Sequence, residues 1–300
     1  MPASKENGAP ITTVVGLSHA KSGFGGISDA EYERFSRFIH TDLGIKMPPA
    51  KKTMLQARLQ KRLRQLGLES FADYYDYVFS AEGRREELGA MIDAVTTNKT
   101  DFFREAHHFD YLTETVLPWF RREAGRGGRR RMQLWSAGCS TGEEPYTLAM
   151  VLRGFQERFA DFDFAILATD ISHRVLKVAS AGIYSEADIA PVAMPLRKKY
   201  LLRSKDRRKK RVCIAPEVRR RVRFGRLNFM AEDYGIREPM HVIFCRNVVI
   251  YFDKATQQKM LQRLYRQMAP GGYLFMGHSE SLNGLNLPFK PIVSTIYRKV

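Results

Sequence analysis

The run from Leu134 to Tyr146 (LWSAGCSTGEEPY) constrains the fold of this chain more than any other segment. An apolar strand pattern ends in a turn that carries Gly138 and Gly142, and a helical run continues from Tyr146 to Leu152. Glycine lets a backbone turn sharply and approach a ligand closely, and Pro145 suits the first turn of a helix. This order of strand, turn and helix predicts a nucleotide-type pocket above the carboxyl edge of a parallel sheet.

The residues after this turn exclude two commoner phosphate pockets. No Lys-Ser/Thr pair follows Gly142, and the three glycines of a dinucleotide fingerprint are missing. Glu143 and Glu144 stand where a pyrophosphate would sit, and their charges would repel phosphate but attract a cation. S-adenosylmethionine, a nucleoside with a positive charge, fits such a pocket. The alternative is that both acids only offset the helix dipole.

A second apolar run, 164–170, predicts a strand that ends in Asp170. An acid at the end of the second strand of such a sheet is placed to accept hydrogen bonds from both ribose hydroxyls. The alternative is that Asp170 caps the following helix, although Ser172 is itself a good N-cap residue. The spacing from the glycine turn favours the ribose role.

Residues 28–98 predict a separate helical domain, because apolar residues recur there at helical spacing. The four stripes are Tyr32, Phe35, Phe38 and Ile39; Leu55, Leu59, Leu63 and Leu66; Phe71, Tyr74, Tyr75 and Val78; and Leu88, Met91, Ile92 and Val95. Residues 1–27 have no periodicity, which indicates a flexible tail, and they lack the apolar stretch of a secretory signal.

Basic side chains outnumber acidic ones by 49 to 32, a net charge of +17 that predicts an acidic partner. The second predicted helix exposes a basic face with no acid before Glu69. Its residues are Lys51, Lys52, Arg58, Lys61, Arg62 and Arg64. Such a face is either merely solvated or a docking surface, and charge alone does not choose between a nucleic acid and an acidic protein.

Residues 99–300 alternate strand and helix patterns, as a parallel α/β domain requires. From about 196 to 227 the pattern changes to three short runs, 200–202, 211–215 and 221–224, which predict a small antiparallel β insertion. Further strands are expected at 241–247, 273–278 and 292–298, with an amphipathic helix from Thr256 to Met268.

The cysteine, histidine and hydropathy patterns indicate a cytoplasmic protein without a metal site. Three scattered cysteines lack the paired spacing of a zinc site and fit a reducing compartment. His107 and His108 are adjacent and have no Glu-x-x-His frame, so they are expected on the surface or in packing. No apolar run approaches the roughly 20 residues of a membrane span.

Five blocks, in order along the chain, resemble the chemotaxis receptor methyltransferases of the CheR family. They are Thr96–Phe109, Trp135–Tyr146, Ala168–Ile171, Cys245–Asp253 and Gly271–Ser281. The resemblance implies an all-α receptor-docking domain followed by a Rossmann-like α/β methyltransferase sheet with a β insertion. It also implies methyl transfer from S-adenosylmethionine to glutamate side chains of a chemoreceptor, which leaves S-adenosylhomocysteine.

The resemblance further implies which residues form the site. Cofactor contacts are expected at Asn98, Thr100, Arg104, Gly138, Glu143, Glu144, Asp170, Asn228, Phe229, Asn247 and Val248. Arg104 and Tyr251 would face the substrate carboxylate. The alternatives are that Asn98 caps a helix near Thr100 and that Tyr251 packs in the core. Asn247 is harder to dismiss, because the carboxyl end of a strand faces the ligand crevice.

The β insertion is a possible docking site of its own. In some members of the family it binds a short peptide at the receptor's tail. Here its loop, Ser204–Lys210, is almost entirely charged, which departs from the family's pattern.

The implied chemistry needs no general base, because a glutamate carboxylate is ionised near pH 7. The positive charge of the sulfonium donor and the negative charge of the carboxylate acceptor cancel as the methyl group moves. Strong binding of the carboxylate would therefore stabilise the ground state more than the transition state and slow methyl transfer. Catalysis is expected instead from positioning of the reactants and exclusion of water. Arg104 is therefore expected mainly to hold the cofactor, while the Tyr251 hydroxyl orients the acceptor oxygen.

The sequence leaves two other classes of function to consider. A nucleic-acid methyltransferase is suggested by the net charge and by the basic run Arg121–Arg131, but no Asn-Pro-Pro-Tyr type run is present, and no nucleic-acid partner is expected. A binding module with a decayed pocket is the other. The intact glycine turn, Asp170 and Asn247 count against it.

Overall fold

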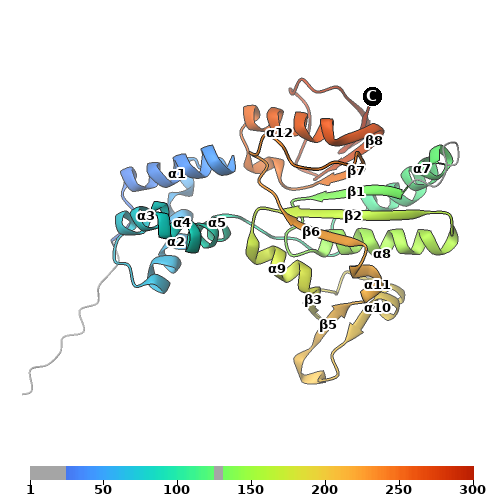
Figure 1. The fold of residues 1–300 in the computed structure, drawn as a ribbon, viewed down its shortest axis with the longest axis horizontal. Coiled ribbons are helices and arrows are strands. Elements are labelled where there is room, and N and C mark those ends of the chain that lie inside the picture. Colours follow the sequence, from blue (N-terminus) through green and yellow to red (C-terminus); the bar gives the residue numbers. More distant parts are fainter. Residues whose placement is uncertain (1–24, 125–130) are drawn as a thin grey trace, which may run out of the picture.

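The computed structural model describes residues 25–124 and 131–300. This part of the chain forms an all-α N-terminal domain and a larger α/β domain, with a small β insertion projecting from the larger one (Figure 1). The predicted fold class is confirmed. Residues 1–24 of the predicted tail and residues 125–130 of the basic run lie outside the described residues.

Capping residues define the helices of the N-terminal domain. Within residues 25–98 the α-helices are α1 (Asp29–Leu43), α2 (Lys52–Leu66), α3 (Phe71–Phe79), α4 (Ala81–Glu86) and α5 (Leu88–Val95). Helix α1 begins at a capping box, in which the side chains of Ser28 and Glu31 each accept a hydrogen bond from the other's backbone N–H. It ends at Gly44, whose φ of 72° is left-handed.

The apolar stripe of α2 packs into the core of this domain. Leu55, Leu59 and Leu63 are fully buried, as their spacing predicts. Leu66, the expected fourth member, is instead 36% exposed. It is the last residue of the helix, and Gly67 turns the chain away with a left-handed φ of 69°.

A sheet of seven strands forms the centre of the α/β domain within residues 131–300, in the order β6-β2-β1-β7-β8-β10-β9. Its strands are β1 (Arg131–Ala137), β2 (Asp163–Asp170), β6 (Val222–Arg226), β7 (Met240–Cys245), β8 (Met268–Met276), β9 (Phe289–Val293) and β10 (Ile296–Lys299). From β6 to β8 neighbours are parallel, and β10 is antiparallel to both of its neighbours. The turns after β1, β2 and β7 therefore meet at one edge.

Helices cover both faces of this sheet (Figure 1). On one face lie α6 (His107–Tyr111), α7 (Leu117–Ala124) and α8 (Glu143–Arg158), and on the other lies α12 (Lys254–Gln267). Successive residues of a strand point to opposite faces, so Leu134 belongs to the first core and Trp135 to the second.

The β insertion differs from its expected extent. Its three strands are β3 (Ile183–Ser185), β5 (Arg211–Ile214) and β4 (Leu201–Arg203), which follow α9 (His173–Ala181). Residues 222–224 of the run expected in this insertion belong to β6, which pairs in parallel with β2 in the main sheet. That expectation was wrong because a short alternating run does not reveal its partner, and Val222 and Phe224 pack against the main core.

The end of the chain also differs from expectation. Instead of one strand over 292–298, β9 and β10 form a hairpin, and its turn residue Thr295 has a φ of 63°. Strand β8 begins at Met268, five residues before the expected strand 273–278, and so includes Gly271 and Gly272. Within the described ranges, no helix is long and apolar enough to cross a membrane.

Backbone and side-chain contacts join the two domains along one seam. Lys46 N donates to the Tyr251 carbonyl at 2.7 Å, and Ile45 forms an isolated bridge with Phe252. Nearby, His40 Nε2 lies 2.6 Å from Asp253 Oδ2, and Asp253 also caps α12. This seam ends at the carboxyl edge of the sheet, where the turns after the parallel strands meet.

Candidate active site

A cavity of about 420 Å³ opens between the N-terminal domain and the carboxyl edge of the sheet. Small-molecule sites have typical volumes of about 300–1,000 Å³. Of the residues expected in the site, the lining includes Asn98, Thr100, Arg104, Gly138, Glu144, Asp170, Asn228, Phe229, Asn247, Val248 and Tyr251. The structure thus brings all of the expected residues together except Glu143.

Gly138 allows two walls of this cavity to approach each other. Its φ is 89°, and a Cβ atom there would lie 2.4 Å from Val248 Cγ2. The backbone N–H groups of Gly138 and Cys139 both donate to the Thr169 carbonyl, at 2.8 and 2.9 Å. The turn after β1 is therefore tied to the end of β2, where Asp170 follows.

Asp170 is buried at the cavity wall and bridges two turns. Its Oδ2 accepts from Ser140 N at 2.9 Å, and its Oδ1 accepts from Ser172 N at 3.0 Å. Burial raises the pKa of Asp170, and these two hydrogen bonds oppose the rise. Ser172, whose hydroxyl accepts from Val175 N, caps α9. Each carboxylate oxygen of Asp170 keeps a second lone pair for a ligand.

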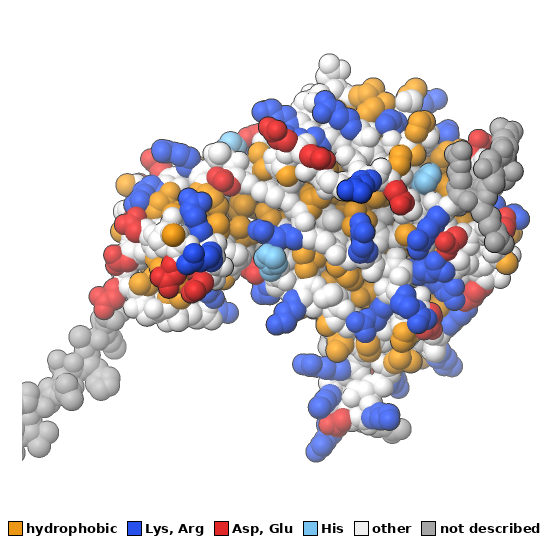
Figure 2. All heavy atoms as spheres, in the orientation of Figure 1, with side chains coloured by type: hydrophobic (Ala, Val, Ile, Leu, Met, Phe, Trp, Pro, Cys, Tyr) orange, Lys and Arg blue, Asp and Glu red, His pale blue; other side chains and the backbone are white. Residues whose placement is uncertain are grey.

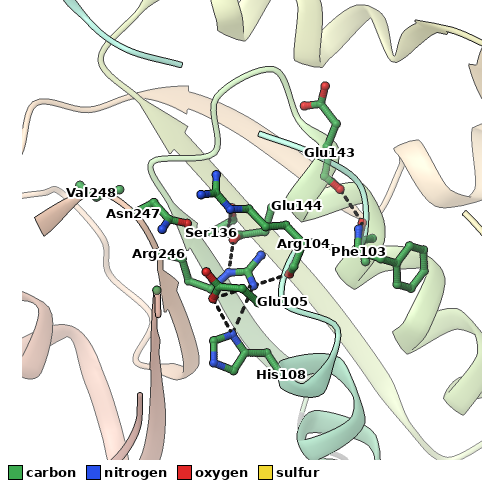
Figure 3. A network of polar contacts seen from close by, with 12 residues as sticks. Phe103, Arg104, Glu105, His108, Ser136, Glu143, Glu144, Arg246, Asn247 and Val248 are labelled. Atoms are coloured by element: carbon green, nitrogen blue, oxygen red, sulfur yellow. Dashed lines mark hydrogen bonds and ion pairs between the residues drawn. The ribbon is translucent and has the colours of Figure 1, made fainter. Parts of the chain in front are cut away.

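Glu144 lies at the cavity but is not a free anion (Figure 3). Its Oε1 accepts from the Ser136 hydroxyl at 2.6 Å, and its Oε2 accepts from Arg246 Nε at 2.7 Å. The Arg246 side chain is only 2% exposed. Sequence reasoning missed Arg246, although the signal was present: a basic residue directly follows a buried apolar strand and precedes Asn247.

Arg246 also connects the sheet to the segment before α6. Its Nη1 donates to the Arg104 carbonyl at 2.6 Å and lies 3.2 Å from His108 Nδ1 and 3.5 Å from Glu105 Oε2. Burial and the nearby guanidinium lower the pKa of His108 to about 3, so the ring is neutral. A ring that accepts at Nδ1 carries its proton on Nε2, which lies 2.9 Å from the Thr295 hydroxyl.

Glu143 is directed away from the cavity (Figure 3). Its Oε2 accepts from the Thr141 hydroxyl at 2.7 Å, and burial raises its pKa to about 7. Adjacent residues of a helix do not share a face, so Glu143 and Glu144 cannot both line the same wall. The structure does not place Glu143 among the expected cofactor contacts.

The segment from Asn98 to Arg104 crosses the cavity without forming a helix. The Asn98 carbonyl accepts from the Ser140 hydroxyl at 2.8 Å, and Phe103 N donates to the Thr147 hydroxyl at 3.2 Å. The first helix after it is α6, so the alternative that Asn98 caps a helix near Thr100 is wrong.

Tyr251 and Asn228 line the cavity on the side of the N-terminal domain. Within the described part of the chain, no hydrogen bond fixes the Tyr251 hydroxyl, which leaves it available to a ligand. Asn228 Nδ2 donates to the Asp42 carbonyl at 2.7 Å, so its amide spans the seam between the domains. Sequence reasoning also missed Leu43, Ile45 and Met47 of the N-terminal domain, which add apolar lining.

Several cations of the basic face of α2 have partners that are distant in sequence: acids form ion pairs with them, and backbone carbonyls accept hydrogen bonds from them. Arg62 Nη2 pairs with Glu87 Oε2, and Glu87 is only 3% exposed. Arg58 Nη1 donates to the Val95 carbonyl at 2.6 Å, and Lys52 pairs with Asp29. This face therefore has partners in other segments, although its own run contains no acid before Glu69.

Basic side chains also gather elsewhere on the surface. On α2, Lys61 and Arg64 remain exposed. Figure 2 shows further Lys and Arg side chains over the β insertion, where Lys205, Lys209 and Arg211 are exposed.

Known proteins share both halves of this architecture. Residues 30–96 match the all-alpha domain of CheR methyltransferases, and residues 98–298 match their SAM binding domain. The chain belongs to the CheR methyltransferase family. It is therefore a methyltransferase with a binding domain for S-adenosylmethionine.

Several relatives are similar to this CheR protein over most of their length. A protein named "Probable chemotaxis protein methyltransferase" from Rhizobium etli is 40% identical over 249 residues, which are 82% of this chain and 90% of that protein. Chemotaxis protein methyltransferases of Borreliella burgdorferi and Klebsiella aerogenes are 35% and 38% identical. These matches cover 91% and 90% of this chain and 95% and 90% of the two relatives.

The cavity of this CheR protein fits S-adenosylmethionine. Gly138 leaves room that any Cβ atom would fill, Asp170 keeps lone pairs for hydroxyl groups, and Phe229 and Val248 give apolar lining for a base. A group of three or more His, Cys, Asp or Glu side chains able to hold a metal ion is absent from residues 25–124 and 131–300.

Proposed function

We propose that this CheR protein methylates glutamate side chains on the cytoplasmic helices of chemoreceptors and so adjusts receptor signalling. The observation that carries the proposal is the joint lining of one cavity by cofactor-type residues, such as Asp170 and Asn247, and by Arg104 and Tyr251. The product would be a glutamate methyl ester, formed in the cytoplasm. The relatives named as chemotaxis protein methyltransferases support the same assignment.

The cofactor would be held by the residues around the glycine turn. Bound S-adenosylmethionine supplies an electrophilic methyl group on a sulfonium centre. Asp170 would accept hydrogen bonds from ribose hydroxyls, and the pairs Asn228-Phe229 and Asn247-Val248 would flank the base. Asn98, Thr100 and Arg104 would contact the cofactor from the segment between the domains.

Glu144 would act on the cofactor differently from a free anion. Because Arg246 compensates its charge, Glu144 would shape this wall and contribute only a weak field toward a cation.

The substrate carboxylate needs orientation rather than activation. It is ionised near pH 7, so no base has to remove a proton. The Tyr251 hydroxyl, free of protein partners in the described part of the chain, would donate a hydrogen bond that aims one carboxylate oxygen. Arg104 donates from Nη1 to the Lys99 carbonyl at 3.1 Å, which limits how tightly it could hold the same carboxylate. A loose contact suits a reaction in which charge is lost on the way to the transition state.

Receptor docking would use cations at the surface of α2. Lys61 and Arg64 are exposed there, whereas Arg58 and Arg62 are part-buried and bind the Val95 carbonyl and the Glu87 carboxylate. We therefore assign the acidic receptor helix to the exposed residues of this face. A receptor-tail peptide at the β insertion stays a prediction, and its charged loop would require acidic side chains in that peptide.

The proposal is tested by incubating the full chain with methyl-labelled S-adenosylmethionine and a chemoreceptor cytoplasmic fragment. Glutamate methyl esters release labelled methanol in mild alkali, and a fragment with its methylatable glutamates changed to alanine should release none. Tyr251→Phe should lower kcat while leaving the Kd of S-adenosylhomocysteine within about twofold. Alkali-stable label, or transfer to nucleic acid instead of the fragment, would show that the function is a different one.

A further inference from the structure

One buried carboxylate organises a wall of the cavity without lining it. Glu280, which is 6% exposed, follows β8. Its oxygens accept five backbone N–H bonds: from Asn247 at 2.8 Å, Val248 at 2.9 Å, Val249 at 2.7 Å, Ile250 at 3.3 Å and Gly277 at 2.7 Å. Four of these donors are consecutive residues of the turn that follows β7 and Arg246.

The N–H groups of residues 247–250 need an external acceptor, because the backbone bonds inside this turn use later donors: Tyr251 N donates to the Val248 carbonyl at 3.2 Å and Phe252 N to the Val249 carbonyl at 3.1 Å. Residues 247–250 bend away from the sheet before α12 begins, and their N–H groups point to one side, toward Glu280. Asn247 has a φ of 58°, a left-handed conformation that costs a non-glycine residue free energy. Such a conformation persists only where the surroundings impose it. Here the surroundings are the Glu280 carboxylate.

Gly277 lets the two turns come close enough for these bonds. A Cβ atom at Gly277 would lie 2.8 Å from Asn247 N and 2.7 Å from Asn247 Nδ2. Both distances are shorter than real Cβ contacts, so a larger residue would push the Asn247 turn away from Glu280. The turn after β8 thus serves as a fixed support for the turn after β7.

The supported turn carries side chains that line the cavity. Asn247, Val248, Ile250 and Tyr251 all belong to the lining, whereas Glu280 does not. Val248 is also the residue that Gly138 approaches so closely. A displacement of this turn would therefore move several contacts of the same ligand together.

We propose that Glu280 is a positioning residue, which holds the Asn247–Tyr251 turn in its ligand-ready form before the cofactor binds. This proposal deepens the proposed function. It rests on one part of that function, namely that the cavity binds a nucleoside cofactor. A positioning role predicts an effect on ligand affinity and on local backbone exchange, whereas a role in overall stability alone predicts neither.

The test compares Glu280→Gln with Glu87→Gln, a matched change at another buried acid. An amide nitrogen cannot accept, so the glutamine at 280 leaves part of the converging N–H groups without a partner. Without ligand, the amides of 247–250 should exchange at least about tenfold faster in Glu280→Gln. The Kd of S-adenosylhomocysteine should rise at least about tenfold. Glu87→Gln should lower Tm but change neither quantity by more than about twofold.

A second variant covers the case in which Glu280→Gln does not fold. Gly277→Ala disturbs the same turn from the other side and should also weaken S-adenosylhomocysteine binding. Where both variants fold, the double variant should raise the Kd of S-adenosylhomocysteine by less than the product of the two single effects. Both changes act on the same Asn247–Tyr251 turn, so their effects are not additive in free energy.

The outcomes separate this proposal from the proposed function. Unchanged exchange at 247–250 in Glu280→Gln would overturn it, as would an equal rise in Kd in Glu87→Gln. Failure of the wild-type protein to bind S-adenosylhomocysteine would instead overturn the cofactor assignment, and the exchange experiment would still decide the role of Glu280.

Discussion

Arg246 and Glu144 form a buried ion pair in the wall of the cavity, with Arg246 Nε 2.7 Å from Glu144 Oε2. The same guanidinium donates to the Arg104 carbonyl. One side chain therefore joins the end of β7, the start of α8 and the segment that carries Arg104 (Figure 3).

Removing Arg246 should destabilise the protein more than removing the whole pair. Arg246→Met leaves a buried carboxylate without its cation, a change that typically costs about 3–5 kcal/mol. The double variant Arg246→Met with Glu144→Gln removes both charges and should recover part of that loss. Denaturant unfolding at pH 7 of the wild type, of the single variants Arg246→Met and Glu144→Gln, and of the double variant measures the difference. Equal stabilities of the single Arg246 variant and the double variant would contradict the pairing.

Glu143 should make the folded state less stable as the pH rises. Its folded pKa of about 7 exceeds the ordinary value of 4.5, so the unfolded chain releases this proton first. Its contribution to stability is present below pH 4.5 and is lost as the pH rises through 7. Between pH 4.5 and 8 the free energy of unfolding of the wild type should fall by on the order of 3 kcal/mol more than that of Glu143→Gln. Urea unfolding from pH 4.5 to 8 measures this, with the exposed Glu114→Gln as a control that should track the wild type.

His108 should act in the opposite direction. Its folded pKa of about 3 lies below the ordinary 6.5, so its contribution is present above pH 6.5 and is lost as the pH falls toward 3. Between pH 6.5 and 5 the wild type should lose on the order of 2 kcal/mol more than His108→Gln does. The slopes of unfolding free energy against pH are compared, because the substitution itself also disturbs packing. The control His173→Gln, at an exposed position, should have the same slope of unfolding free energy against pH as the wild type. Parallel slopes for His108→Gln and the wild type would refute a neutral buried ring at His108.

Arg62 and Lys61 are neighbours on α2 but should respond differently to replacement. Arg62→Ala leaves Glu87 buried without its cation and should cost about 3–5 kcal/mol. Lys61→Ala, at an exposed position, should change stability by no more than about 0.5 kcal/mol. Thermal unfolding of both variants measures the contrast. Similar losses of stability in the two alanine variants would show that Arg62 has no structural role. If Arg62→Ala is the less stable variant, receptor docking is better tested with Lys61→Glu than with charge reversal at Arg62.

Sequence reasoning succeeded where a local pattern determines the geometry. The strand that ends in Asp170 and the turn at Gly138 place both residues at the carboxyl edge of a parallel sheet, whatever surrounds them. The spacing of Leu55, Leu59 and Leu63 likewise determines which side of α2 is buried.

Sequence reasoning failed where a partner comes from a distant segment. Glu143 and Glu144 look equivalent in sequence, and only the packing of α8 separates them. Arg62 looked unopposed because Glu87 lies in another helix. The run that forms β6 carried no signal for its pairing with β2 rather than with the insertion. Glu280 lies in the block Gly271–Ser281, which resembles the family as a whole. The sequence does not reveal its five backbone partners, because they depend on the meeting of the turns after β7 and β8.

The lining of the cavity by Leu43, Ile45 and Met47 means that the helical domain supplies part of the cavity wall. A fragment that starts at residue 98 would keep every strand of the sheet yet lose one side of the nucleoside's surroundings. Exchanging this domain between relatives would for the same reason replace one wall of the cavity, so we expect such an exchange to change the affinity for the methyl donor as well.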